Sequence, residues 1–261
     1  MFVFLNNKFL PQNEAGIPVT DHGFLYGDGI YETILQQEGH VFNLQAHLNR
    51  LDKSAILTNL HIPDINLEKA VKDLVKLNKL HKSRIRITVT RGSNSFEFST
   101  CQKPLVLITE TEIKSTPETY KAVTINLERP YPKAKSISRI TENLARAEAE
   151  RNNVHECFFV DSKSNLTEGS ITNLFIVKRK KILMPRLHNH LPGTIQQQVL
   201  KLAQKYNIPV IEKDLKLKHL FKADEVFVTN ALIGIKPLVE VNSKPLKTGK
   251  ITQLLAKNLW V

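Results

Sequence analysis

Two residues of this chain have side chains that could act together on a bound aldehyde. Lys135 lies in the segment Ala134-Lys135-Ser136-Ile137, and Glu168 begins the segment Glu168-Gly169-Ser170-Ile171-Thr172-Asn173. A lysine amine can hold an aldehyde as a Schiff base. A carboxylate can keep the nitrogen of a pyridine ring protonated, which turns that ring into an electron sink. The pair therefore predicts chemistry on an aromatic aldehyde cofactor.

A second motif is suited to a phosphate group. Leu191-Pro192-Gly193-Thr194-Ile195 leads directly into a predicted amphipathic helix of about residues 194–206. A helix N-terminus that follows glycine exposes unpaired N–H groups and the positive end of the helix dipole. Without context, the same motif is equally typical of an ordinary helix start. Its meaning therefore depends on the motifs around it.

The order of these motifs resembles that of the fold-type IV pyridoxal phosphate enzymes, which include branched-chain and D-amino acid aminotransferases and 4-amino-4-deoxychorismate lyase. The glycine-containing stretch from Asp21 to Thr33 is similar to the N-terminal signature of this family. Glu168-Gly169-x-x-x-Asn173, followed by Leu174-Phe175-Ile176-Val177, is the most specific local match. The resemblance continues to Pro237 and implies pyridoxal 5'-phosphate as the cofactor.

The resemblance also implies a fold of the α/β (α+β) class with two domains. The expected parts are a smaller N-terminal α/β domain of residues 1–112 and a linker of residues 113–121. A larger cofactor-binding domain of residues 122–261 should follow, with a pseudo-barrel sheet. Polar residues and Pro117 near the linker are typical of such a boundary.

Individual residues obtain expected roles from the same resemblance. Lys135 precedes a predicted helix as the family's Schiff-base lysine does, whereas the nearby Lys133 does not match. Glu168 corresponds to the glutamate at the pyridine nitrogen, and Arg50 corresponds to the phosphate-binding arginine. Tyr31 falls at a substrate-binding position. Further cofactor contacts are implied for Ile171, Thr172, Thr194, Ile195, Asn230 and Ala231.

Some positions depart from the family pattern. Relatives often have serine where Ile171 stands, so only its backbone N–H would be available. In the stretch that begins the helix near residue 194, relatives read Gly-Ile-Thr-Arg. This chain has its hydroxyl at Thr194 instead, and Gln196 replaces the arginine. Backbone contacts to phosphate would survive these changes, but the side-chain contacts would differ.

The choice among family members depends on two segments. Asn230-Ala231-Leu232-Ile233-Gly234-Ile235-Lys236-Pro237 is similar to a segment of aminodeoxychorismate lyases, and it favours a lyase of folate biosynthesis that gives 4-aminobenzoate and pyruvate. After Thr90-Arg91-Gly92 the chain lacks the Arg-x-His trap of D-amino acid aminotransferases. Phe96-Glu97-Phe98 departs from the lyase pattern as well. The alternatives are a branched-chain or D-amino acid aminotransferase and, more remotely, a non-catalytic basic binding protein.

Charge and composition limit the partners. The 261 residues carry a formal net charge of +12, which favours anionic partners. The densest basic run, Lys178-Arg179-Lys180-Lys181, separates two apolar stretches and is typical of a hairpin tip rather than a nucleic-acid surface. No zinc-ligand spacing or RNA-binding signature is present in the sequence. We therefore expect a small anionic substrate, and no nucleic acid, metal or membrane.

Location and assembly follow from weaker signals. Met1-Phe2-Val3-Phe4-Leu5 is too short for a signal peptide and is typical of a strand, so a cytoplasmic protein is expected. Cys101 and Cys157 lack an activating motif and fit inert core positions in a reducing compartment. The family resemblance implies a homodimer, and the apolar stretch that contains Phe24 and Tyr26 could cover a partner.

Hydrophobic periodicity predicts the elements that must position these residues. The predicted helices cover about residues 44–59, 67–80, 140–151 and 194–206. The predicted strands cover about residues 1–5, 84–90, 104–109, 122–127, 156–160, 173–177, 182–184, 226–228 and 238–241.

Overall fold

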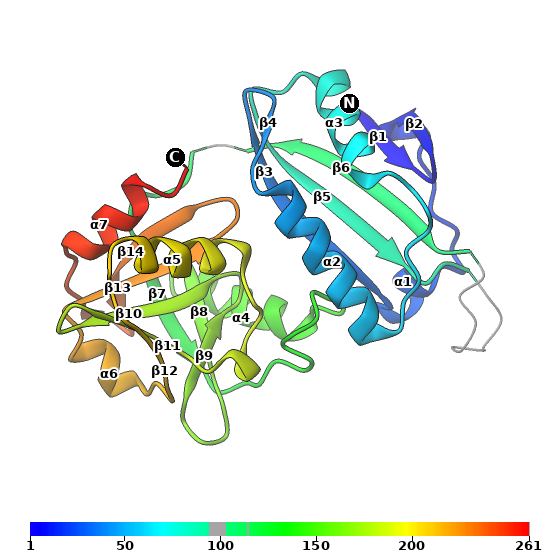
Figure 1. The fold of residues 1–261 in the computed structure, drawn as a ribbon. Coiled ribbons are helices and arrows are strands. Elements are labelled where there is room, and N and C mark those ends of the chain that lie inside the picture. Colours follow the sequence, from blue (N-terminus) through cyan, green and yellow to red (C-terminus); the bar gives the residue numbers. More distant parts are fainter. Residues whose placement is uncertain (94–102, 114, 261) are drawn as a thin grey trace. The chain divides into compact units, whose positions relative to one another are not determined.

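The computed structural model describes residues 1–93, 103–113 and 115–260, and the chain divides into two compact units (Figure 1). Unit 1 consists of Met1–Ser115 and Ala134–Arg139, and unit 2 consists of Thr116–Lys133 and Ile140–Val261. The short segment that contains Lys135 therefore belongs to unit 1, although the chain on both sides of it belongs to unit 2.

Unit 1 is built on a six-stranded antiparallel sheet with the order β2-β1-β6-β5-β3-β4. Two longer helices pack on one face of this sheet, and two short helices precede β3. The strands are β1 (Phe2–Leu5), β2 (Lys8–Pro11), β3 (Gly29–Gln37), β4 (His40–Val41), β5 (Lys82–Thr90) and β6 (Leu105–Glu112). The helices are η1 (Gln12–Glu14), α1 (His22–Tyr26), α2 (Leu44–Thr58) and α3 (Leu67–Asn78).

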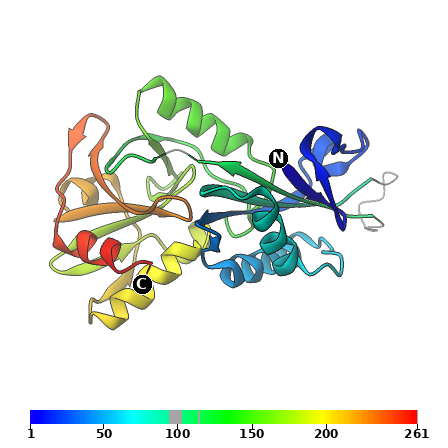
Figure 2. The same cartoon turned by 90° about the horizontal axis from the view of Figure 1, so that it is seen from above.

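The two faces of this sheet differ because the strands alternate. Ile85 and Ile87 of β5 are fully buried and pack with Leu51 of α2 and Leu74 of α3. Side chains at the intervening positions point to the opposite face, which bears Arg86. Figure 1 and Figure 2 show both helices against the same face of the sheet. The opposite face is therefore the polar and basic one.

Unit 2 contains a nine-stranded sheet in which β12-β11-β10-β13-β14-β7-β8-β9 follow one another and β15 pairs with β14. Its strands are β7 (Tyr120–Ile125), β8 (Glu156–Val160), β9 (Leu166–Gly169), β10 (Asn173–Lys178), β11 (Lys181–Met184), β12 (Val210–Glu212), β13 (Glu225–Asn230), β14 (Gly234–Val241) and β15 (Lys244–Pro245). Its helices are α4 (Ile140–Arg151), η2 (Leu187–Asn189), α5 (Thr194–Lys205), α6 (Leu217–Phe221) and α7 (Lys250–Lys257).

The sheet of unit 2 curls on itself. Leu166, at the β9 end of the strand order, forms an isolated antiparallel bridge with Leu215, just after β12 at the other end. Both leucines are buried in a core that includes Phe158 and Val228, on the inner side of the curl. Helices α5 and α7 pack on a second core around Phe175, and α4 packs on β8. Figure 2 accordingly shows α4 and α5 at opposite sides of this unit.

Most of the predicted elements are present in the structure. Helix α4 and strand β8 have the predicted bounds, and the basic tip between β10 and β11 is a turn in which Arg179 and Lys180 have positive φ angles. Cys157 is buried, and burial raises the pKa of its thiol to about 12. Cys101 and Phe96-Glu97-Phe98 lie outside the described residues. Within the described ranges, no helix is both long and apolar enough to cross a bilayer.

Candidate active site

Lys135 is fixed to the open edge of β3 in unit 1. The N–H of Tyr31 donates to the carbonyl of Lys135 at 2.9 Å, and the N–H of Ile137 donates to the carbonyl of Gly29 at 3.0 Å. The N–H of Lys135 also donates to the hydroxyl of Ser54 on α2 at 3.1 Å. Because β3 and α2 both hold this backbone, the lysine has a defined position, whereas Lys133 is an exposed residue of unit 2.

Tyr31 lies at the centre of a group of cations in unit 1. Its buried ring has the Arg86 guanidinium at 3.9 Å, the Lys135 amine at 4.7 Å and the Arg139 guanidinium at 5.3 Å from its centroid. Burial and the neighbouring Arg84 lower the pKa of Arg86. Among the residues described, no carboxylate lies within salt-bridge distance of Arg86. This face can therefore stabilise an anion.

Arg50, predicted to bind phosphate, forms a buried two-bond ion pair inside unit 1. Its Nε and Nη2 donate to the two carboxylate oxygens of Glu32 at 2.8 and 2.7 Å, and His47 Nδ1 lies 2.7 Å from the same carboxylate. Burial opposes the charge on Glu32, but Arg50 and His47 outweigh it and lower its pKa to about 2. Burial lowers the pKa of His47, which favours its neutral form. Arg50 is thus positioned by Glu32.

The Glu32 pair gives a prediction about stability against pH. The pKa of Glu32 falls from 4.5 to about 2 on folding. This carboxylate should therefore contribute about 3 kcal/mol above pH 4.5 and lose that contribution as the pH falls towards 2. We expect Glu32→Gln to lack this acid-dependent loss, although it is less stable at pH 7. Denaturant unfolding between pH 7 and 3 measures the difference. Glu38→Gln, at an exposed position, is the matched control and should keep the wild-type slope.

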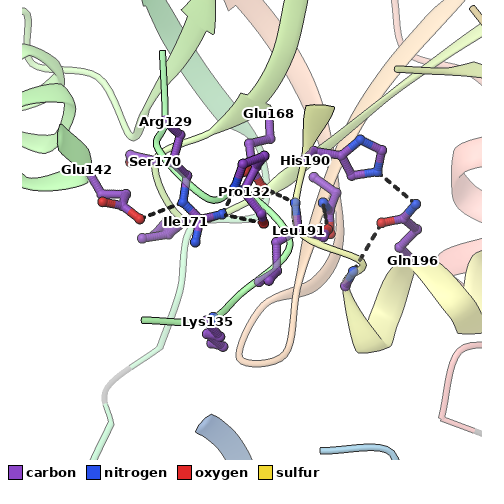
Figure 3. Close-up of polar contacts among 12 residues, drawn as sticks. Arg129, Pro132, Lys135, Glu142, Glu168, Ser170, Ile171, His190, Leu191 and Gln196 are labelled. Carbon is purple, nitrogen blue, oxygen red and sulfur yellow. Dashed lines mark hydrogen bonds and ion pairs between the residues drawn. The ribbon is translucent and has the colours of Figure 1, made fainter. Parts of the chain in front are cut away.

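Glu168, on β9 of unit 2, is held from two sides (Figure 3). Its Oε1 accepts from Arg129 Nη1 at 2.7 Å, and its Oε2 accepts from the N–H of Leu191 at 3.1 Å. Arg129 also donates through Nε to Glu142 at 2.7 Å, and all three charged side chains are at most 10% exposed. Burial opposes the charge of Arg129, but the two carboxylates outweigh it and raise its pKa. Arg129 therefore fixes the position of the Glu168 carboxylate.

The loop after Glu168 is organised by a second carboxylate, Glu156. Its Oε1 accepts from the N–H and hydroxyl of Ser170 at 2.8 and 2.5 Å. Its Oε2 accepts from the N–H of Ile171 at 3.3 Å and the hydroxyl of Thr172 at 2.8 Å. Burial raises the pKa of Glu156, and these donors only partly offset it. Ile171 and Thr172 thus donate to Glu156, which shapes the loop, and their predicted contact with the cofactor stays a prediction.

The predicted cofactor contacts Thr194 and Ile195 lie at the start of α5 in unit 2. Thr194 and Ile195 are buried in the first turn of α5. Gly193, just before them, has no room for a side chain, since a Cβ would lie 2.0 Å from Asn173 Oδ1. Thr229, the β13 partner of Asn173, has a buried hydroxyl without a hydrogen-bond partner in the described part of the chain. Gly193 thus packs directly on Asn173, and the strand residue paired with Asn173 has a buried hydroxyl that no described residue binds.

Asn230 is the last residue of β13, and Ala231 begins the turn that leads to β14. The Asn230 side-chain oxygen accepts from the N–H groups of Leu232 and Ile233 at 2.9 and 3.0 Å, and Gly234 has a φ of 67°. The asparagine side chain therefore shapes its own turn, as asparagine commonly does. Contact with a cofactor at this position would come from the backbone of the turn.

Several residues of the site were not singled out from the sequence. Four of them hold a predicted residue by a charged hydrogen bond or a ring contact, and they are Glu32, Arg86, Arg129 and Glu156. Glu32 had a signal, because it interrupts the buried alternation of Ile30 and Ile34 in β3. Arg129 had none, since it lies in a polar stretch with its partner Glu168 39 residues away.

The chain is similar to known aminotransferases in both sequence and structure. A family model described as amino-transferase class IV matches residues 29–241. A putative branched-chain-amino-acid aminotransferase of Methanocaldococcus jannaschii is 32% identical over 98% of this chain and 93% of its own. A D-alanine aminotransferase of Staphylococcus aureus strain N315 is 28% identical over 95% of this chain and 92% of its own.

Solved structures agree with the observed fold. The branched-chain aminotransferase from Thermoproteus uzoniensis, crystallised with norvaline, has a TM-score of 0.93 at 26% identity, and the match covers 99% of this chain and 93% of the other. The branched-chain amino acid aminotransferase from Escherichia coli has a TM-score of 0.90 at 24% identity, covering 98% and 92%. The predicted mixed α/β fold with a curled sheet is therefore confirmed.

Proposed function

Because the chain belongs to the class IV aminotransferase family, we propose that it transfers amino groups between an amino acid and a 2-oxo acid. The cofactor prediction is confirmed for the family, whose solved members include forms with pyridoxamine 5'-phosphate and pyridoxal phosphate. The relatives named above are aminotransferases, which favours this alternative over the lyase predicted first from the sequence.

The residues present fit pyridoxal phosphate. When bound, the cofactor supplies the electron sink for bond breaking next to the amino group. Lys135 would hold its aldehyde carbon and move the proton, and Glu168 would face its ring nitrogen. Arg50 and the first turn of α5 would hold the phosphate. The buried hydroxyl of Thr229, which has no partner among the described residues and lies on the strand position paired with Asn173, supports this fit in unit 2.

The observation that carries the proposal is the position of Lys135 relative to Tyr31 and Arg86. The lysine amine and the guanidinium lie 4.7 and 3.9 Å from the centroid of one buried ring. An amino group that must be transferred and a carboxylate that must be held are the two fixed features of an amino acid. A reactive amine beside a cation without a carboxylate partner among the described residues suits both.

We propose a branched-chain L-amino acid as the donor and 2-oxoglutarate as the acceptor. The M. jannaschii relative is named for branched-chain amino acids. The sequence lacks the Arg-x-His trap expected for D-amino acids, and the departing segment Phe96-Glu97-Phe98 lies outside the described residues. Arg86 would bind one carboxylate of the acceptor. D-Alanine is the competing donor, because the S. aureus relative is named a D-alanine aminotransferase.

Aminodeoxychorismate lyase is the second candidate function. It is supported by the sequence from Asn230 to Pro237, which contains Gly234 at a positive φ and forms the β13–β14 turn. A lyase substrate with two carboxylates would also suit the cations around Tyr31. The two functions differ in one requirement, since transamination needs an amino acceptor and the lyase reaction does not.

The deciding experiment uses that difference. Purified enzyme with added pyridoxal phosphate is supplied with L-leucine or D-alanine, each with 2-oxoglutarate, and glutamate formation is measured. A parallel reaction contains aminodeoxychorismate and no acceptor, and 4-aminobenzoate and pyruvate are measured. We expect glutamate with L-leucine. Pyruvate and 4-aminobenzoate at a comparable rate would overturn the aminotransferase proposal in favour of the lyase, and D-alanine as the better donor would overturn the donor assignment.

We further propose that the protein is a homodimer. Of the aromatic residues in the N-terminal signature, Tyr31 is buried, but Phe24 is 73% exposed and Tyr26 is 48% exposed. The nearby α2 leaves Ile56 80% exposed and Leu57 55% exposed. Exposed apolar side chains of this size are typical of surfaces that a partner covers. This surface, Phe24, Tyr26, Ile56 and Leu57, is the candidate contact with a second copy.

Replacing Phe24 with aspartate tests the dimer. Light scattering at micromolar concentration should give twice the chain mass for the wild type and close to one chain mass for Phe24→Asp, because a charge would have to be buried in the contact. Tyr131→Asp, at an exposed aromatic residue away from this surface in the sequence, should stay dimeric. A wild-type monomer with full activity would refute the proposal.

A further inference from the structure

A chain of three hydrogen bonds fixes the turn that begins α5. The Nδ1 atom of His190 lies 3.0 Å from the carbonyl oxygen of Arg186, and its Nε2 lies 2.9 Å from Gln196 Nε2. The Oε1 atom of Gln196 accepts from the N–H of Gly193 at 3.1 Å. Figure 3 shows the His190 ring directed at the Gln196 amide. Both side chains are 1% exposed, so water does not compete for these groups.

One arrangement of protons satisfies the whole chain of bonds. Because Gln196 Oε1 accepts from Gly193, the amide nitrogen of Gln196 faces His190 and donates to its Nε2. His190 is then neutral, with its proton on Nδ1, where it donates to the carbonyl of Arg186. Burial lowers the pKa of His190, and the carboxylates of Glu168 and Glu212 only partly offset it. The neutral ring is therefore the expected form at neutral pH.

The turn held in this way lies where the phosphate is proposed to bind. Asn173 Nδ2 donates to the carbonyl of Leu191 at 2.8 Å, so residues 190–193 are fixed on a second side. Gly193 directly precedes the first turn of α5, and a helix N-terminus favours an anion such as phosphate. The N–H of Gly193 donates to the side chain of Gln196. The conformation of this turn is therefore fixed by the protein before any ligand binds.

We propose that His190 and Gln196 are positioning residues that hold the start of α5 in the shape that binds the phosphate of the cofactor. This inference rests on the proposed function, and it gives Gln196 a role other than that of the arginine found in relatives. The pair acts through the backbone of Gly193. A change in either side chain should therefore alter cofactor affinity, and that affinity should depend on the proton carried by His190.

Cofactor titration of the apoenzyme tests the proposal. The enzyme is stripped of cofactor, and the dissociation constant of pyridoxal phosphate is measured by absorbance. We expect Gln196→Leu to raise this constant by about tenfold, the effect of losing one or two hydrogen bonds. Gln197→Leu, at the exposed next position of the helix, is the matched control and should match the wild type. An unchanged constant for Gln196→Leu would overturn the inference.

A second variant separates positioning from a merely structural role. In Gln196→Glu the new carboxylate can accept from both Gly193 and His190, provided that His190 is protonated. Its dissociation constant, divided by that of the wild type at each pH, should fall as the pH decreases from 8 to 5.5. The wild type keeps His190 neutral and should change less over that range, because burial lowers the pKa of His190. A ratio that stays constant with pH would overturn the proton-dependent part, even if Gln196→Leu fails to fold.

Failure of the inference and failure of the proposed function give different results. If wild-type enzyme binds no pyridoxal phosphate, the proposed function fails and the inference fails with it. If the wild type binds the cofactor and forms glutamate from L-leucine, but neither Gln196 variant differs from it, only the positioning role is lost. Melting temperatures of the three apoenzymes show whether each variant is folded.

Discussion

Replacing Lys135 with alanine is expected to abolish covalent attachment of the cofactor and to lower turnover by about 10³-fold or more, since one residue serves as both anchor and proton carrier. The physical reason is that Lys135 combines the amine with a backbone held by β3 and α2. Borohydride reduction of the loaded enzyme, followed by peptide mapping, identifies the attached lysine. The backbone bonds of Lys135 do not depend on its side chain, so the variant should fold.

Lys133→Ala is the matched control for this prediction. Lys133 lies two residues earlier and is exposed, so its removal should change neither attachment nor turnover. Reduction that labels Lys133, or any lysine other than Lys135, would contradict the assignment. Retention of turnover in Lys135→Ala would contradict it as strongly.

The second large effect is expected for Glu168→Gln. The amide has nearly the same shape as the carboxylate, so the cofactor should still bind, but it cannot hold a proton on the ring nitrogen. Turnover should fall by about 10²- to 10³-fold, the scale of losing one preorganised electrostatic contact. The single amide oxygen of glutamine can accept from either the Leu191 N–H or Arg129, so one of these two contacts would keep the side chain in place. Steady-state kinetics at saturating cofactor measure the loss of turnover, and the absorbance of the bound cofactor shows whether the cofactor still binds.

Glu142→Gln is the control that shares the environment of Glu168. Glu142 is bound to the same guanidinium and is equally buried, but it is not proposed to contact the cofactor. Both variants disturb Arg129, so a similar loss of stability is expected from both. Only Glu168→Gln should lower turnover strongly. Equal kinetic effects in the two variants would mean that Arg129, and not Glu168, is the group that the chemistry depends on.

Local sequence patterns predicted the elements well because those elements bury an apolar face of regular period. Helix α4 and strand β8 have the predicted bounds, and α2 ends one residue early at Thr58. Helix α1 was not predicted, because five residues are too few to show a helical period. Its one sequence signal is Asp21, whose carboxylate accepts from the N–H groups of Gly23 and Phe24.

The supports of the site were harder to predict than the residues they support. Lys135 and Glu168 are found from motifs that are local in sequence. The Glu32–Arg50 pair joins a strand to a helix 18 residues later, and the Arg129–Glu168 pair spans 39 residues. Such contacts depend on which elements become neighbours, and local periodicity does not contain that information. The bonds from Ile171 and Thr172 to Glu156 were not predicted for the same reason, and the contact of these two residues with the cofactor stays a prediction.

The return of residues 134–139 to unit 1 has a consequence for biosynthesis. The open edge of β3 at Gly29 and Tyr31 is completed by Lys135 and Ile137, which the ribosome makes long after β3. The hydrogen bond from the N–H of Lys135 to the hydroxyl of Ser54 joins residues 81 positions apart in the sequence. Contacts between residues so far apart in the sequence form slowly during folding. Until residues 134–139 have been made, this part of β3 lacks the partner that it has in the folded protein, and an unpaired strand edge can pair wrongly with another chain. The segment that contains Lys135 therefore has two roles: its backbone pairs with the exposed edge of β3, and its side chain supplies the amine.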